Sequence, residues 1–323
     1  MKDGYGRELD YLRISLTDKC NLRCGYCMPP AGVPLLSHRE ILTLEEVFRL
    51  SRIFVSLGIK KIRLTGGEPL IRKNLVWLIR MLSGLPGLET IALTTNGSLL
   101  CGRVGELKEA GLSRINISID SLREEVFQRL TGKDLLCDVL QGIREAEEEG
   151  LYVKLNCVPI RGINEGELID IARLSKHGRT DVRFIELMPI GCASKYEGIP
   201  SEEIKRRLEE AYGRAEPLTG YEKAGPAEYY RYPGLAGRIG LISPMSHPFC
   251  KDCGRLRLTA EGYLKLCLEK EEGIDLRSPV RGGASDGELR EMIMEAVKKK
   301  PLGHSFGSGA LDTDKRRMVQ IGG

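Results

Sequence analysis

Three cysteines lie close together near the start of the sequence, directly after a short apolar run at residues 12–16. This first triad (Cys20, Cys24 and Cys27) has the spacing C-x3-C-x2-C. Disulfides need an even number of cysteines, whereas a structural zinc ion or a cubane iron–sulfur cluster takes four ligands. Three thiolates leave one position open, which is typical of catalytic metal sites. The pattern therefore favours a catalytic metal site, the alternative being a zinc ion completed by a distant fourth ligand.

A second incomplete set of cysteines lies in the last third of the sequence. This second triad (Cys250, Cys253 and Cys267) has the spacing C-x2-C-x13-C. One triad could arise by chance, but two in one chain favour a pair of iron–sulfur clusters, each with one iron left open. The alternative for the second triad is a structural zinc ribbon in which His247 is the fourth ligand.

Composition excludes several classes of protein. The 323 residues are 41% hydrophobic, and the net charge is only +4, with 49 basic and 45 acidic side chains. The chain has no long basic run and no apolar run of membrane-spanning length, so we expect neither nucleic acid nor a membrane as a partner. Its first residues lack the features of a signal peptide, so we expect a cytoplasmic protein. In that reducing compartment clustered cysteines are metal ligands or catalytic thiols, and we interpret the isolated ones as small apolar residues: Cys101, Cys137, Cys157 and Cys192.

Six short β-rich runs alternate with segments of helical periodicity. The runs cover residues 12–16, 60–65, 90–97, 114–120, 152–158 and 182–188. Helical periodicity is found at residues 42–58, 74–85, 121–130, 135–150 and 167–178. This regular succession predicts a parallel sheet, and we expect a partial (β/α)6 barrel of the TIM type.

Alternate side chains in five of the six runs share a polar face, as Lys61 does with Arg63 and Thr94 with Asn96. Parallel sheets flanked by helices are normally buried on both faces. The pattern therefore predicts a polar, cationic interior instead of a solvated surface. In the sixth run Arg183 has the parity of apolar residues, so its alignment with the others requires a bulge.

The alternation ends after residue 191. A helix is expected at residues 201–212, and the runs at residues 237–245 and 254–270 predict a small sheet around the second triad. We therefore expect an α/β chain with two domains. These are the barrel at residues 1–190 and, at residues 191–323, a C-terminal small-sheet extension that carries the second iron–sulfur cluster.

Several motifs resemble those of a known enzyme superfamily. The first triad, TGGEP at residues 65–69 and TTNG at residues 94–97 resemble the radical S-adenosylmethionine (SAM) enzymes. The second triad, GRLRLT at residues 254–259 and the terminal IGG resemble, more narrowly, the GTP 3′,8-cyclase family, which acts first in molybdenum cofactor biosynthesis. The resemblance runs from residue 12 to residue 323.

The resemblance implies two [4Fe-4S] clusters and SAM as cofactors. The first triad would hold the cluster whose open iron binds SAM, and an electron from that cluster would release a 5′-deoxyadenosyl radical. The second triad would hold the cluster whose open iron faces the guanine base of GTP. The positions that match the family's SAM contacts are Tyr26, Gly67, Ser118 and Met188.

The resemblance also implies a lyase that converts GTP to (8S)-3′,8-cyclo-7,8-dihydroguanosine 5′-triphosphate. The matching GTP contacts are Arg13, Lys61, Arg63, Thr94, Lys154, Arg255 and Arg257. Catalytic roles are implied for Arg255, Arg257, Lys154 and Arg183, and for Gly322 and Gly323 at the end of a tail that would enter the active site. Two arginines that are two residues apart on a strand face one way, which suits a triphosphate.

Two other functions remain open from the sequence. One is a radical SAM enzyme that modifies a peptide, although such enzymes usually need more C-terminal cysteines, and Cys267 is the last one here. The other is a non-catalytic iron–sulfur or zinc protein for electron transfer or regulation. As partners the resemblance implies GTP, SAM and a reductase or flavodoxin-type electron donor, and it allows a homodimer.

Overall fold

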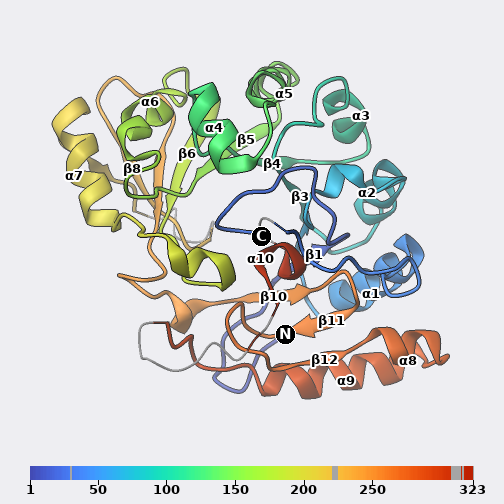
Figure 1. Cartoon of the computed structure of the whole chain (residues 1–323). Helices are drawn as coiled ribbons and strands as arrows, with labels where there is room; N and C mark the ends of the chain where they lie inside the picture. The colour runs from blue at the N-terminus through green and yellow to red at the C-terminus, as the bar shows by residue number, and fades with distance from the viewer. Residues whose placement is uncertain (30, 220–224, 307–313, 315, 323) are drawn as a thin grey trace.

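The computed structural model describes residues 1–29, 31–219, 225–306, 314 and 316–322. Its centre is a curved sheet of six parallel strands with helices along the outer side (Figure 1). The strands are β1 (Tyr11–Ser15), β2 (Lys61–Thr65), β3 (Thr90–Thr95), β4 (Arg114–Ser118), β5 (Tyr152–Cys157) and β6 (Thr180–Ile185). The helices between them are α1 (Leu44–Ser56), α2 (Leu75–Ser83), α3 (Val104–Glu109), α4 (Glu124–Thr131), α5 (Leu136–Glu148) and α6 (Leu168–Arg173). The predicted partial (β/α)6 barrel is confirmed.

The C-terminal extension continues this sheet at both edges. The order of the strands is β12-β11-β10-β1-β2-β3-β4-β5-β6-β9-β8-β7. The added strands are β7 (Glu216–Pro217), β8 (Glu228–Arg231), β9 (Ile239–Ile242), β10 (Arg255–Leu258), β11 (Tyr263–Lys265) and β12 (Gly273–Asp275). The later helices are α7 (Ser201–Tyr212), α8 (Arg277–Arg281), α9 (Asp286–Lys298) and α10 (Met318–Ile321). Because β10 pairs with β1, residues from the two ends of the chain become neighbours.

Helix α1 illustrates how the sequence directs a local element. The side chain of Thr43 accepts a hydrogen bond from the backbone N–H of Glu46, and the Glu46 carboxylate accepts one from the backbone N–H of Thr43. Such caps stabilise a helix by about 0.5–2 kcal/mol. Val47, Leu50 and Phe54, at helical spacing, are buried in the core between α1 and the sheet.

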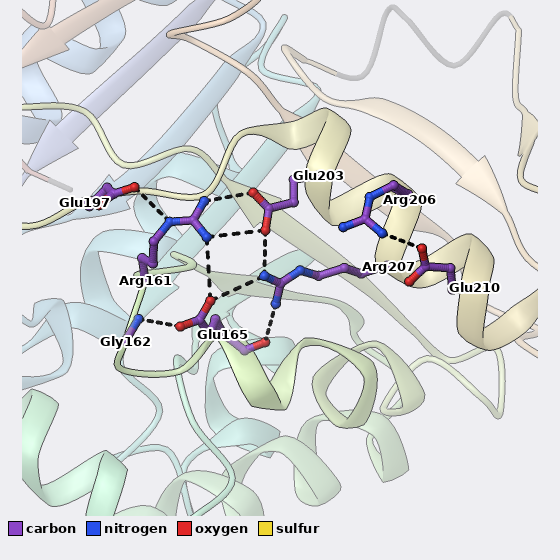
Figure 2. A network of polar contacts seen from close by, with 8 residues as sticks. All are labelled: Arg161, Gly162, Glu165, Glu197, Glu203, Arg206, Arg207 and Glu210. Atoms are coloured by element: carbon purple, nitrogen blue, oxygen red, sulfur yellow. Dashed lines mark hydrogen bonds and ion pairs between the residues drawn. The ribbon is translucent and has the colours of Figure 1, made fainter.

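A network of ion pairs fastens α7 to the barrel (Figure 2). Arg161, in the loop after β5, lies 2.8 Å from Glu203 of α7 and 2.8 Å from Glu197. Arg207 of α7 lies 2.5 Å from Glu203 and 3.3 Å from Glu165. These side chains are partly exposed, so a single pair contributes at most about 1 kcal/mol, but the network fixes the position of α7. The chain is therefore tied together across residue 190, and the division into domains at that point stays a prediction.

The structure differs from the predicted elements in several respects. Helices α3, α8, α9 and α10 were not predicted, and α3, with six residues, is too short to show a clear period. Of the two runs expected to form a small sheet around the second triad, only residues 254–270 do so, because β9 pairs with β6 at the other edge of the main sheet. The expected bulge at Arg183 is absent, since β5 and β6 pair in unbroken register from Val153 opposite Thr180 to Cys157 opposite Phe184. No helix of the described residues has both the length and the apolar character needed to cross a membrane.

Candidate active site

The first triad lies where the strands of the barrel end. Its loop follows β1, Gly67 follows β2, Ser118 is the last residue of β4, and Met188 follows β6. The carboxyl ends of parallel strands meet at one edge of a sheet, so these residues are brought together. The first triad, Tyr26, Gly67, Ser118 and Met188 all line one cavity of about 360 Å³. All four positions expected to contact SAM are therefore gathered with the first triad.

The second triad lies toward the opposite ends of the strands. Cys253 comes two residues before β10, which runs parallel to β1, so it lies beside the amino end of the barrel strands. Strand β11 runs antiparallel to β10, and Cys267 follows it, so the chain returns to the same end. All three cysteines of the second triad line the cavity that the first triad lines. The two triads thus face one cavity from opposite ends of the sheet.

The thiols of each triad lie close to one another. Burial raises the pKa of Cys24, and its two partners in the first triad raise it further. Burial and the two partners of Cys250 likewise raise the pKa of that thiol, although a hydrogen bond from the backbone of His304 opposes them. His247, the fourth zinc ligand considered for the second triad, does not line the cavity. Three thiols in each triad are the donor set of a [4Fe-4S] cluster with one open iron, so the residues present fit such a cluster.

The charged groups and thiols near Cys253 and Cys192 could not be inferred from the positions of these cysteines in the sequence. Although burial would raise the pKa of Cys253, the charges of Arg255 and Lys300 lower it to about 7, which favours the thiolate that a metal binds. Cys192 lies in the 3₁₀ helix η3 (Gly191–Lys195). Burial and the neighbouring Cys20 raise the pKa of Cys27 to about 12, and Cys192 adds a further, smaller increase. The loop after β6 therefore brings Cys192 close to the first triad.

The loops around the first triad are packed backbone against backbone. A Cβ atom on Gly67 would lie 2.4 Å from the carbonyl oxygen of Lys19, so only glycine allows this approach. Tyr26 Oη donates a hydrogen bond to Asp120 Oδ2 (2.7 Å), which joins the cysteine loop to the end of β4. The Glu68 carboxylate accepts hydrogen bonds from residues at the end of β3, and burial raises its pKa to about 7.

A row of guanidinium groups crosses the sheet between the two triads. Arg13 of β1 is paired in register with Arg257 of β10 on one side and with Arg63 of β2 on the other. Residues paired across neighbouring strands point to the same face, so these three side chains share the inner face. Arg183 and Arg255 also line the cavity. Among the described residues, no carboxylate forms a salt bridge with Arg63, Arg183, Arg255 or Arg257.

The neighbouring guanidinium groups repel one another, so the charged form of each is less stable. Burial lowers the pKa of Arg13 well below its usual range, and the neighbouring Arg257 and Arg63 lower it further. Burial and the neighbouring Arg255 lower the pKa of Arg257 to about 10. Burial also lowers the pKa of Arg183. A polyanion in the cavity would offset this repulsion, because guanidinium groups bind phosphate oxygens in pairs of hydrogen bonds.

Two of the expected substrate contacts do not line the cavity. Lys61 is the first residue of β2, and its Nζ lies 3.2 Å from Asp10 Oδ2 at a half-exposed position. Lys154 is buried, donates a hydrogen bond to Tyr229 Oη (2.5 Å), and lies over the rings of Tyr152 and Tyr229. Burial, followed by the charge of Arg183, lowers the pKa of Lys154 to about 7. Thr94, in contrast, lines the cavity and accepts a hydrogen bond from Arg63.

The end of the chain reaches the row of arginines. Helix α10 lies near the middle of the curved sheet (Figure 1), and Met318 and Val319 line the cavity. Arg257 Nη1 donates a hydrogen bond to the carbonyl oxygen of Gly322 (2.6 Å). Gly322 has φ +85°, and a Cβ atom there would lie 2.5 Å from Thr65 Oγ1. Gly323, the other expected tail residue, lies outside the described residues.

Sequence reasoning missed several residues that line the cavity. Tyr11 accepts a hydrogen bond from Arg63. Burial would raise the pKa of Tyr11, but the charges of Arg63 and Arg13 lower it to about 8. Tyr11 lies two residues before Arg13 on β1, so its side chain points to the same face, and this alternation could have identified it from the sequence. Lys300 also lines the cavity, but its position after a surface helix carried no signal.

Two family models match most of the chain. The model of the Radical SAM superfamily matches residues 14–175, and the model of Molybdenum Cofactor Synthesis C matches residues 180–306. The first match holds the first triad and the second match holds the second triad.

Curated relatives are similar over the whole chain. The GTP 3′,8-cyclase of Moorella thermoacetica is 48% identical over 326 residues, which cover 100% of both chains. The GTP 3′,8-cyclases of Pelotomaculum thermopropionicum and Clostridium perfringens are 48% and 46% identical, again with 100% of both chains covered.

Solved structures share the fold at low identity. SuiB of Streptococcus suis bound to S-adenosylmethionine has a TM-score of 0.58 and 15% identity, covering 88% of this chain and 68% of SuiB. SuiB bound to its precursor peptide SuiA has a TM-score of 0.59 and 15% identity, covering 93% of this chain and 72% of SuiB. At such identities the likeness shows the fold alone.

Proposed function

Because this chain belongs to the GTP 3′,8-cyclase family of radical SAM enzymes, we propose that it converts GTP to (8S)-3′,8-cyclo-7,8-dihydroguanosine 5′-triphosphate, the first step of molybdenum cofactor biosynthesis. The family uses [4Fe-4S] clusters together with SAM. The observation that carries the proposal is that two cysteine triads face one cavity with a row of buried guanidinium groups between them.

We assign the first triad and the carboxyl edge of the sheet to the first cluster and SAM. When bound there, the cluster and SAM supply a radical that removes a hydrogen atom from the substrate. The proposed SAM contacts are Tyr26, Gly67, Ser118 and Met188. Tyr26 is held in place by its hydrogen bond to Asp120, and the backbone packing at Gly67 keeps its loop against the cysteine loop.

We assign the arginine row to the triphosphate and the second triad to the cluster that holds the guanine. Arg13, Arg63 and Arg257 would bind phosphate oxygens, and Arg255, whose guanidinium lies 4.8 Å from the centre of the Phe249 ring, would extend the row toward the second triad. The ribose then lies between the two ends of the cavity, where a hydrogen atom can be removed. The proposed set of substrate contacts is completed by Arg183, Thr94, Lys61 and Lys154. The two lysines do not line the cavity.

The carbonyl oxygen of Gly322 would position Arg257. It accepts a hydrogen bond from one guanidinium nitrogen and leaves the others to the substrate. Because it has no side chain, Gly322 can lie this close to the sheet, where a Cβ atom would meet Thr65. The tail would thereby hold the arginine row in one arrangement during the reaction.

Peptide modification, the main rival, is supported only by the fold that this chain shares with SuiB. A neutral peptide would bring no anion to the guanidinium groups of Arg63, Arg183 and Arg257, which is unfavourable in a buried site. A nucleoside triphosphate supplies several negative charges at that point. The charge of the cavity therefore favours the nucleotide.

The decisive experiment follows a hydrogen atom. The enzyme is reconstituted with iron and sulfide under anaerobic conditions and incubated with SAM, a reductant and GTP deuterated at the 3′ position of the ribose. We expect deuterium in the 5′-deoxyadenosine and the cyclised nucleotide as product. ATP, as a matched control with the same triphosphate, should not yield a cyclised product at a comparable rate. Deuterium-free 5′-deoxyadenosine formed while the cyclised product accumulates would exclude abstraction from this position.

The supply of electrons and the state of the enzyme in the cell stay predictions. We propose that a reductase or a flavodoxin-type protein delivers electrons and that the enzyme works in the cytoplasm. A homodimer is compatible with this proposal and can be checked by analytical ultracentrifugation.

A further inference from the structure

Lys300 occupies an unusual position beside the second triad. It follows α9 by two residues, is only 2% exposed, and lines the active-site cavity. Its Nζ donates hydrogen bonds to the carbonyl oxygen of Arg255 (2.9 Å) and to that of Leu266. Arg255 comes two residues after Cys253, and Leu266 directly precedes Cys267. The ammonium group thus joins the two segments that carry cysteines of the second triad.

The charge of Lys300 has no carboxylate partner. Among the described residues no acidic side chain forms a salt bridge with it, and Glu269, which lines the same cavity, pairs with Lys270 (3.5 Å). Burying an ammonium group is costly unless an anion compensates it. Two carbonyl oxygens supply hydrogen bonds but no negative charge. The neighbouring Arg255 adds a second positive charge, so an anion at this site would stabilise both groups.

The anionic groups at this place are the thiolates of the second triad. Lys300 lines the same cavity as these three cysteines, and its Nζ is hydrogen-bonded to backbone carbonyl oxygens of Arg255 and Leu266, which lie within two residues of Cys253 and Cys267. An iron–sulfur cluster held by three thiolates would bring lasting negative charge to this position. The reduction potential of such a cluster depends on nearby charge, hydrogen bonds and exposure to solvent.

We propose that Lys300 is the counter-cation of the second iron–sulfur cluster, a positioning residue that holds the ligand-bearing segments together and raises the reduction potential of that cluster. Reduction adds negative charge, and a fixed positive charge stabilises the reduced form. The inference rests on the proposed function only in taking Cys250, Cys253 and Cys267 as cluster ligands. The competing explanation is a neutral role, in which Lys300 serves only as a hydrogen-bond donor between two segments.

Four proteins separate charge from hydrogen bonding. Lys300→Gln keeps donor hydrogens and removes the charge, whereas Lys300→Arg keeps the charge. Lys298→Gln is the matched control, because Lys298 is two residues away, 61% exposed and paired with Glu295. Each variant and the unaltered enzyme are reconstituted, assayed for iron and sulfide, and titrated with reductant while the EPR signals of the reduced clusters are recorded. The signal that SAM does not perturb belongs to the second cluster.

We expect Lys300→Gln to lower the reduction equilibrium constant of the second cluster at least about tenfold, which is a shift of ~59 mV toward more negative potential for a one-electron couple. Lys300→Arg and Lys298→Gln should keep the potential of the unaltered enzyme. Selective loss of the second cluster from Lys300→Gln, with restoration in Lys300→Arg, supports the same proposal. A Lys300→Gln enzyme with both clusters and an unchanged potential would overturn it.

Two further outcomes are decided by the same measurements. If Lys300→Gln is insoluble, Lys300→Arg decides, because recovery of solubility, iron and potential supports a need for charge, whereas loss of the second cluster in that variant refutes it. If the assignment of the second triad is wrong, the unaltered enzyme itself holds the iron of only one cluster and shows no SAM-insensitive signal. That failure of the proposed function is visible before any Lys300 variant is compared.

Discussion

Replacing Gly322 by alanine tests whether the C-terminal tail takes part in the reaction. In the structure Gly322 has φ +85°, and a Cβ atom would lie 2.5 Å from Thr65 Oγ1 and 3.1 Å from Ser15 Cβ. Both residues are buried at the ends of β1 and β2, so neither can move away easily. The substitution therefore acts against the docked tail itself and touches no proposed cluster ligand.

The magnitude follows from two costs and one gain. A non-glycine residue with positive φ costs about 1–2 kcal/mol, and forcing a methyl group into a packed site costs about 1–3 kcal/mol. Together these are about 2–5 kcal/mol. The hydrogen bond from Arg257 to the Gly322 carbonyl stabilises the docked tail by about 1.5–3 kcal/mol, which is of the same size or smaller. Since 1.4 kcal/mol is a factor of ten, the equilibrium constant for docking should fall by roughly thirtyfold or more. In the middle of both ranges the cost exceeds the gain by about 1.2 kcal/mol, which leaves the tail docked in about a tenth of the molecules.

The assay compares product formation with SAM cleavage. Gly322→Ala should form cyclised nucleotide roughly tenfold more slowly, keep both clusters, and still cleave SAM. Hydrogen exchange at the α10 amides should become faster. Gly283→Ala is the matched control, because Gly283 has φ +87° and nothing within 4 Å of its Cβ position. That variant carries the same backbone strain without the clash and should form product normally. A Gly322→Ala enzyme with the normal rate of cyclisation would refute a role for the docked tail.

Three more predictions follow from the same site. Cys20→Ser should abolish SAM cleavage, whereas Cys253→Ser should leave some 5′-deoxyadenosine but no cyclised product; full product in Cys253→Ser would make the second triad dispensable. Arg255→Ala should keep both clusters. Its affinity for GTP, measured by calorimetry, should fall by a factor of roughly ten to a hundred, because one charge-assisted contact is lost. The same measurement on Arg173→Ala should change little, because Arg173 is exposed and pairs with Asp170 outside the cavity lining, and an equal loss in both would contradict the geometry. Because burial lowers the pKa of Lys154 to about 7, a bound polyanion should raise it again; the affinity for GTP should then fall as the pH rises above 7, by up to tenfold per pH unit, and Lys154→Met should remove this dependence.

The sequence alone determined the strands and the inward direction of most of their polar side chains. Alternation along a strand is a local property, so the parity of Arg13 and Arg63 was enough to predict a cationic interior. The same rule identifies the face of the sheet on which a side chain lies, but not whether the side chain reaches the cavity or the surface. Lys61 shares the face of Arg63, yet it stands at the first position of β2 and reaches Asp10 at the surface. Lys154 is turned toward Tyr229, a residue of a strand that no local pattern could place beside it.

Only the tertiary structure decided how the two ends of the chain meet. The pairing of β10 with β1 places Arg257 next to Arg13 and sets the second triad at the amino end of the sheet, opposite the first. Strand pairing between distant segments depends on hydrogen bonds that any backbone can make, so the sequence carries little signal for the choice of partner. The same holds for Lys300, whose importance comes from two backbone carbonyls contributed by other segments. Spacing along the chain thus predicted which residues would be the cluster ligands, whereas the packing of distant segments decided what surrounds them.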